Sequence, residues 1–182
     1  FPAAAGLGLL AVLGIPRTAI YSTMISNFAR DTEIRRSVEA VNRHLGASGQ
    51  LQVVLETDYN DAFKEPENLA LIEELQGWLA GLPDVTGSTS LVDYVKLIHR
   101  GFRGHDPAEH RIPESRRLVS QLLFFGSSDD VAGFVNSQYR IANIRVRTTA
   151  LDSADLGALV RSIEARLAQL PARVDGRVAG NL

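Results

Sequence analysis

An internal repeat constrains the fold of this chain more than any other feature of its sequence. The segment NLALIEELQGWLAGLPDVT, residues 68–86, is matched by LGALVRSIEARLAQLPARV, residues 156–174, so that Leu170 stands 88 positions after Leu82. Both copies carry apolar residues at helical spacing, and both lie between runs in which apolar and polar residues alternate. Such alternation indicates a half-buried strand. Each half of the repeat therefore predicts a strand, a helix and a strand.

Two strand–helix–strand units in one chain are the pattern of a split βαβ, ferredoxin-like sandwich. We place the units at residues 51–90 and 140–180, with a helical insertion at residues 91–139 between the halves. The sequence thus predicts an α+β fold in which both repeat helices cover the same face of one four-stranded sheet. Leu75 and Ile163 stand at equivalent positions of the repeat, and both are expected to be buried.

The N-terminal segment FPAAAGLGLLAVLGI, residues 1–15, is apolar throughout. Between Pro2 and Pro16 a helix would reach roughly 20 Å at about 1.5 Å per residue, whereas a bilayer core needs about 30 Å. Three interpretations stay open: the last part of a transmembrane helix, a buried core segment, or an interfacial stretch. Small residues favour the first, because they are common where membrane helices pack. We therefore assign residues 1–17 to the end of such a helix or a linker, and residues 18–182 to the domain.

Composition argues against several functions. The net charge of −2 gives no long-range field to attract nucleic acid, so no nucleic-acid partner is expected. The chain has no cysteine, which excludes disulfides, thiolate metal sites and thiol nucleophiles. It also has no GxSxG nucleophile motif and no glycine-rich phosphate loop after a predicted strand. We expect neither enzyme activity nor a cofactor.

A metal site is not expected either. The run HDPAEH, residues 105–110, groups two histidines with two carboxylates, but Pro107 breaks the helical turn that would bring them together. The run lies in a charged loop, where such side chains are usually solvated. Ligands of a metal site need surrounding groups to orient them.

Aromatic residues gather in the predicted insertion and are the candidate binding residues. We predict that Tyr94, Phe102, Phe124 and Phe125 face an apolar cargo. The alternative is that they cover the core where the extra helices pack on the sandwich. Phe124 and Phe125 argue against that alternative, because adjacent residues of a helix point about 100° apart and cannot both enter one narrow buried face.

Longer stretches resemble a known family. The stretch LQVVLETDYNDAFKEPENLALIEELQGWLAGLPDVTGSTSLVDYVKLIHRGF, residues 51–102, resembles the periplasmic domains of RND-superfamily exporters of the MMPL-like branch. The segment DTEIRRSVEAVNRHLG, residues 31–46, and the tail YRIANIRVRTTALDSADLGALVRSIEARL, residues 139–167, are similar to other parts of the same domain. The likeness is greater to the domain after the seventh membrane helix than to the one after the first.

The resemblance implies an extracytoplasmic porter domain of a bacterial inner-membrane protein. In such exporters, proton flow through carboxylates in the membrane drives the export of hydrophobic or lipid-like cargo. This chain would then handle cargo, and its partners would be the membrane helices, a sister porter domain and the cargo. The alternative function is a ferredoxin-like regulatory domain that binds a small molecule. The apolar N-terminus and the long insertion favour the exporter.

Four arginines are predicted to lie on the sheet face opposite the helices. Arg145, Arg147, Arg173 and Arg177 alternate with apolar residues in the strands that follow the insertion. In an exporter this face would dock the sister domain. The alternative is that the face is simply solvated, as one face of an antiparallel sheet commonly is.

Overall fold

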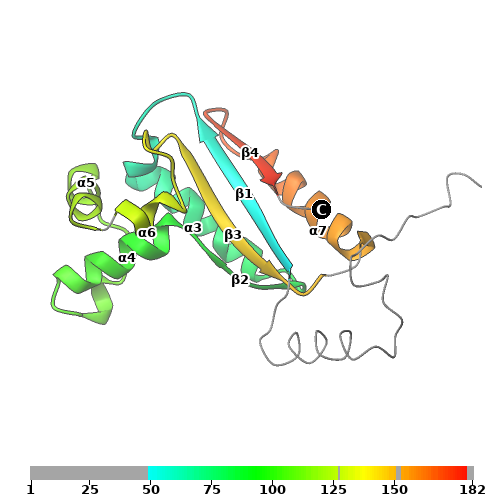
Figure 1. The fold of residues 1–182 in the computed structure, drawn as a ribbon, viewed down its shortest axis with the longest axis horizontal. Coiled ribbons are helices and arrows are strands. Elements are labelled where there is room, and N and C mark those ends of the chain that lie inside the picture. Colours follow the sequence, from blue (N-terminus) through cyan, green and yellow to red (C-terminus); the bar gives the residue numbers. More distant parts are fainter. Residues whose placement is uncertain (1–48, 127, 151–152, 180–182) are drawn as a thin grey trace, which may run out of the picture.

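The structure is a computed structural model that describes residues 49–126, 128–150 and 153–179. The expectations for residues 1–48 lie outside these ranges. Four strands form one sheet: β1 (Gly49–Thr57), β2 (Val85–Thr89), β3 (Ile141–Thr148) and β4 (Val174–Ala179). Their order is β2-β3-β1-β4, and every pair of neighbouring strands is antiparallel (Figure 1). The chain therefore has an α+β fold with a four-stranded antiparallel sheet.

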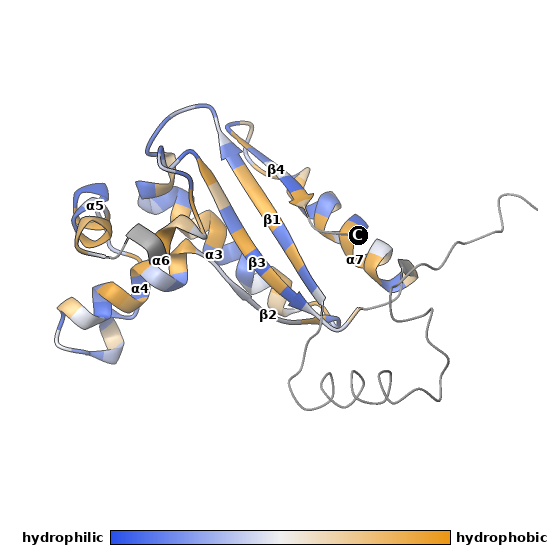
Figure 2. Ribbon diagram, in the orientation of Figure 1, coloured by the Kyte–Doolittle hydropathy of each residue, from blue (hydrophilic) through white to orange (hydrophobic). Residues whose placement is uncertain are grey.

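The register of the two central strands gathers their apolar side chains on one face. Leu51 pairs with Val146, and Val53 pairs with Ile144. These residues are buried, while their neighbours along each strand are exposed or half-buried. The alternation of hydrophobic and hydrophilic residues along β1 and β3 is visible in Figure 2. The side chains on one face of the sheet are thus part of the hydrophobic core.

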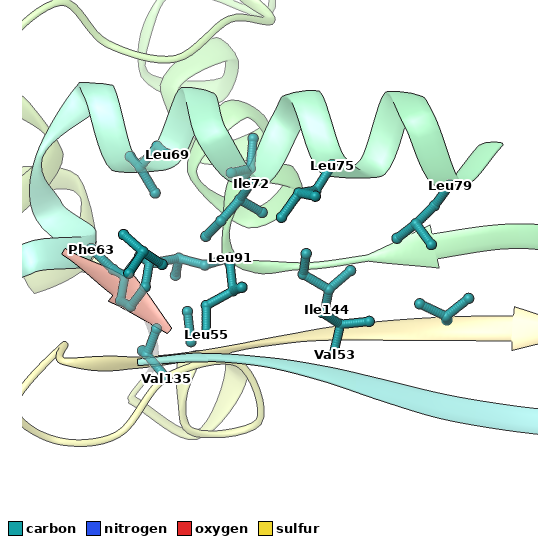
Figure 3. Packing of buried hydrophobic residues seen from close by; sticks show 14 of the residues in the cluster. Val53, Leu55, Phe63, Leu69, Ile72, Leu75, Leu79, Leu91, Val135 and Ile144 are labelled. Carbon is teal, nitrogen blue, oxygen red and sulfur yellow. The ribbon is translucent and has the colours of Figure 1, made fainter. Parts of the chain in front are cut away.

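Two helices cover that face. They are α3 (Pro66–Ala80), which contacts β2, and α7 (Ser153–Leu167), which contacts β4. Leu75 and Ile163 are 2% and 1% exposed, as the repeat predicts, and both belong to the single core cluster that contains the buried side chains of β1. Figure 3 shows the buried side chains of α3 directed toward those of β1 and β3. The prediction that both repeat helices pack on the same face is confirmed.

The helical insertion consists of α4 (Leu91–Phe102), the short 3₁₀ helix η3 (Pro107–Glu109), α5 (Arg116–Phe125) and α6 (Ser128–Ala132). A further 3₁₀ turn, η2 (Ala62–Lys64), precedes α3. The sequence of the insertion predicts helices at residues 91–102, 114–125 and 129–135, and the bounds of α4 agree with the first of these. Helix α5 was expected from Glu114 but begins two residues later, because the Ser115 side chain caps it by accepting a hydrogen bond from the Leu118 N–H.

The expected helix at residues 129–135 is wrong in its second half. After α6 the chain becomes extended, and Val135 forms a β-bridge with Ala142 of β3. The Asn143 N–H donates to the Phe134 carbonyl at 2.8 Å. Residues 134–136 therefore form hydrogen bonds with the backbone of β3 where β2 no longer pairs with it. This pairing outweighs the local helix propensity of the segment.

Polar contacts fix the insertion to the first repeat helix. The Ser90 hydroxyl donates to the Gln76 side chain of α3 at 2.8 Å and accepts from the Val92 N–H at 3.1 Å. Asp93 accepts hydrogen bonds from the Ser90 N–H and from the Gln76 side-chain amide, each at 2.8 Å. Lys96 adds an ion pair with Glu73 of α3. The start of α4 is therefore held against α3 by a capping box and a shared glutamine.

We predict that Leu75→Ala and Ile163→Ala each lower the free energy of unfolding by about 2–5 kcal/mol, because each leaves a cavity in a packed core. Urea unfolding followed by circular dichroism measures the effect. Leu97→Ala, at an exposed leucine on α4, is the control and should change stability by less than about 0.5 kcal/mol. Equal small effects at all three positions would contradict the shared core.

Candidate functional site

Four apolar side chains stand exposed together on the insertion. Phe102, Phe124 and Phe125 are 62%, 83% and 68% exposed, and Leu97 is 60% exposed. The Phe125 ring centroid lies 5.7 Å from that of Phe102 and 5.7 Å from that of Phe124. We call Leu97, Phe102, Phe124 and Phe125 the aromatic ridge. It lies on α4 and α5, at the end of the molecule opposite α7 (Figure 1).

Helical geometry explains why these residues are not buried. Helix α5 buries Val119, Leu122 and Leu123, and the two phenylalanines that follow fall on its outer side. The Phe124–Phe125 pair therefore resists burial as the sequence predicts. The sequence analysis did not name Leu97 as a site residue, although its position along the helix indicated that it would be exposed. It stands off the buried stripe of α4, which consists of Leu91, Val92, Val95 and His99.

Two shallow depressions flank the ridge. One measures about 550 Å³ and the other about 680 Å³. The first is lined by Leu97, Ile98, Arg100, Gly101, Phe102 and His105, and the second by Arg116, Arg117, Ser120, Gln121, Phe124 and Phe125. Neither lining contains a carboxylate. The surface thus combines aromatic rings with arginines of the same helices, a pairing that the sequence analysis did not consider.

Tyr94, the fourth predicted site residue, is not one of the exposed side chains of the ridge. It is half-buried and packs against the core cluster. Its hydroxyl lies so close to Gly126 that a Cβ added there would stand 2.5 Å from it. Tyr94 therefore contacts the C-terminal end of α5 and helps to set where Phe124 and Phe125 project.

The loop between α4 and α5 is fastened by a buried histidine and an ion-pair cluster. His99 Nδ1 lies 2.9 Å from the carbonyl oxygen of Arg111, so Nδ1 carries the proton and donates. Glu109 lies 3.7 Å from His99 Nε2 and 3.4 Å from Arg111. The hydrogen bond that Arg111 donates to Glu114, followed by the charge of Glu109, raises the pKa of Arg111 above its ordinary value. These contacts hold the loop between α4 and α5 against His99 of α4.

The opposite sheet face is polar, as predicted. Arg147, Arg145 and Arg177 stand opposite Gln50, Gln52 and Val54, on the side away from the core. The expectation for Arg173 is wrong in one respect, because β4 begins at Val174 and Arg173 precedes the strand.

The side chains of this polar face are partly paired with one another. Glu56 accepts from Arg140 at 2.9 Å and from Arg177 at 3.3 Å. Arg145 donates to the Gly133 carbonyl at 3.1 Å and stacks on the Phe134 ring at 4.8 Å. Arg140, Arg145 and Arg177 thus have specific partners on this face, which suits a docking surface as well as a solvated face.

Comparison with known proteins adds nothing to this geometry: no protein-family model and no curated protein matches the chain. Among the residues that the structure describes, no three histidine or carboxylate side chains converge as they would around a metal ion. Across the same residues, no helix has the length and apolar character needed to span a bilayer. The ridge with its arginines and the polar sheet face are therefore the candidate interaction surfaces of the chain.

We predict that Gly126→Ala lowers the free energy of unfolding by about 1–3 kcal/mol, because its Cβ would overlap the Tyr94 hydroxyl. Gly77→Ala is the matched control. No atom lies within 4 Å of a Cβ at position 77, and alanine in a helix interior stabilises by about 0.5–1 kcal/mol. The cost of Gly126→Ala should fall in a Tyr94→Phe background. An unchanged cost in that background, measured by urea unfolding, would show that Tyr94 does not set this end of α5.

Proposed function

We propose that this chain is an extracytoplasmic cargo-handling domain of a proton-driven exporter of the RND superfamily, MMPL-like branch, with hydrophobic or lipid-like cargo. The observation that carries the proposal is the aromatic ridge, which presents three exposed phenylalanines on a helical insertion between the halves of the repeat. Large exposed apolar side chains gathered in one place mark an interaction site. In this proposal the domain faces the periplasm and belongs to a bacterial inner-membrane protein.

The strand order supports the porter-type fold. A sheet ordered β2-β3-β1-β4, with each helix of the repeat joining two strands that are not neighbours, is the arrangement of a split βαβ, ferredoxin-like sandwich. We propose that the domain is of this type, with the helices of residues 91–139 inserted between its two units. Fold alone does not determine function, so the argument for export rests on the insertion and on the sequence resemblance.

The dimensions of the ridge surface suit a lipid-like molecule. The two depressions, about 550 and 680 Å³, fall in the range of roughly 300–1,000 Å³ that ligand sites occupy. Their aromatic linings offer apolar contact, while Arg100, Arg116 and Arg117 offer contacts for a polar head. A cargo molecule with an apolar chain would lie along the ridge.

The polar sheet face is then the surface for the sister porter domain. Arg147 is exposed on this face, and within the described residues it forms no ion pair. Arg177 is also exposed, and in the described part of the chain its one ion pair is with Glu56. These guanidinium groups can donate hydrogen bonds to carboxylates of a second domain, and such pairing would fix its orientation.

Binding of a fluorescent fatty-acid analogue, kept below its micelle concentration, tests the proposal. Each ring that contacts the probe contributes about 1.5 kcal/mol, so Phe124→Ser and Phe125→Ser should each weaken binding about tenfold. Both rings are exposed, so both variants should retain the circular dichroism spectrum and unfolding midpoint of the parent. Titration by fluorescence measures the dissociation constant.

Tyr59→Ser is the control, because Tyr59 is a large exposed side chain far from the ridge in sequence, on the loop after β1. It should leave probe binding unchanged. The cargo-handling proposal fails if neither phenylalanine variant weakens binding, or if Tyr59→Ser weakens it equally. If Phe124→Ser and Phe125→Ser both unfold the chain, the rings belong to the core and the proposal also fails.

A further inference from the structure

Exposed apolar side chains are concentrated at one place in the described part of the chain. Four of the five large hydrophobic residues that are exposed there belong to the aromatic ridge, and Tyr59 is the fifth. The rings of the ridge are mostly exposed, and the two depressions that they border are open to solvent and are not closed cavities. A site that encloses a small ligand covers most of the ligand surface. Projecting rings are better suited to entering a soft surface than to surrounding one molecule.

The charge around the ridge is predominantly positive. Arg103 directly follows Phe102, and Arg117 lines the depression beside Phe124 and Phe125. Among the residues that the structure describes, neither Arg103 nor Arg117 forms an ion pair, whereas Arg116 is paired with Glu65 at 2.9 Å. Residues 97–125 contain five arginines and three carboxylates, in a chain whose net charge is −2. The ridge is therefore flanked by uncompensated positive charge.

We propose that the aromatic ridge docks on the surface of a lipid bilayer that carries anionic headgroups. Phe102, Phe124 and Phe125 enter the boundary between headgroups and acyl chains, where aromatic rings partition favourably. Arg103 and Arg117 contact the phosphates, and an anionic membrane surface attracts such residues. The rings of the ridge are exposed, the flanking arginines form no ion pair among the described residues, and neither depression contains a carboxylate. An anionic bilayer surface complements these features in both charge and apolar character. Docking depends on the ridge and does not require the proposed export function.

Partition of the 182-residue chain into vesicles tests the proposal. One set of vesicles contains phosphatidylcholine alone, and the other contains phosphatidylglycerol in place of part of it. Because the apolar segment Phe1–Ile15 can bind vesicles by itself, the readout is the difference between variants that share this segment. Cosedimentation measures the bound fraction at a fixed lipid concentration.

The charge variant is Arg103→Gln with Arg117→Gln. An arginine near an anionic surface changes partition about fivefold, so this pair should lower binding to the anionic vesicles by about tenfold or more. Binding to the neutral vesicles should not change. Arg161→Gln with Arg173→Gln is the matched control. Both residues are exposed and lie outside the insertion, and the two substitutions remove the same charge as the charge variant does. The control should leave partition within about twofold of the parent.

The apolar variant is Phe124→Ser with Phe125→Ser, and it should lower partition into both kinds of vesicle. Phe102→Ser gives an independent test of the same surface if the double variant fails to fold. The proposal is overturned if these phenylalanine variants bind vesicles as the parent does. It is also overturned if the two arginine pairs lose binding equally, which would indicate a response to net charge alone.

The two proposals fail in different ways. The fatty-acid analogue below its micelle concentration reports cargo binding, and the vesicles report docking on a bilayer. If the chain binds the probe but the ridge variants partition into vesicles as the parent does, the docking proposal is overturned and the cargo-handling proposal is retained. Ridge-dependent vesicle partition without probe binding supports docking and removes the proposed cargo function.

Discussion

The packing of two helices against one face of the central strands is the interaction on which the rest of this structure depends. Strands β1 and β3 run through the middle of the sheet, and their paired apolar side chains leave water only if helices cover them. Helices α3 and α7 supply that cover with equivalent stripes of the repeat. Because both helices lie on the same side, the opposite face of the sheet is left with its arginines.

The position of the insertion follows from this arrangement. Helix α4 begins directly after β2, and its first turn is bound to Gln76 and Glu73 on the outer side of α3. Helix α4 thus enlarges the core, because its residues Leu91, Val92 and Val95 are buried beside α3. Helix α5 packs against α4 in turn, so the outer sides of both helices have no further layer of the described chain to cover them. The ridge is exposed because it lies on these uncovered outer sides of α4 and α5.

The aromatic ridge and the polar sheet face can serve different partners at once. The ridge is apolar with flanking arginines, and it lies on the insertion helices. The polar face lies on the strands and is organised by the contacts of Glu56 with Arg140 and Arg177. The cargo-handling function that we propose would need two such surfaces, and the fold separates them by placing one on its strands and the other on its added helices.

Helix and strand bounds were predictable where a local signal was strong. Pro66 starts α3 because its fixed backbone angle suits a first helical turn, and the Ser90–Asp93 pair starts α4. The end of α6 was not predictable, because a hydrogen bond between Asn143 and Phe134 across the fold determines it. A contact of this kind leaves no mark in the local sequence pattern.

The sequence by itself determined the core and one property of the ridge. The repeat specified which faces of α3 and α7 are buried, since apolar spacing is read along a single element. Adjacent phenylalanines at the end of α5 also had to leave at least one ring outside. Only the tertiary structure placed Phe102 beside Phe125 and brought Arg117 to the same surface. Phe102 ends α4, whereas Arg117 and Phe125 both belong to α5. Their approach to Phe102 depends on how α4 and α5 pack, which no spacing within either helix encodes.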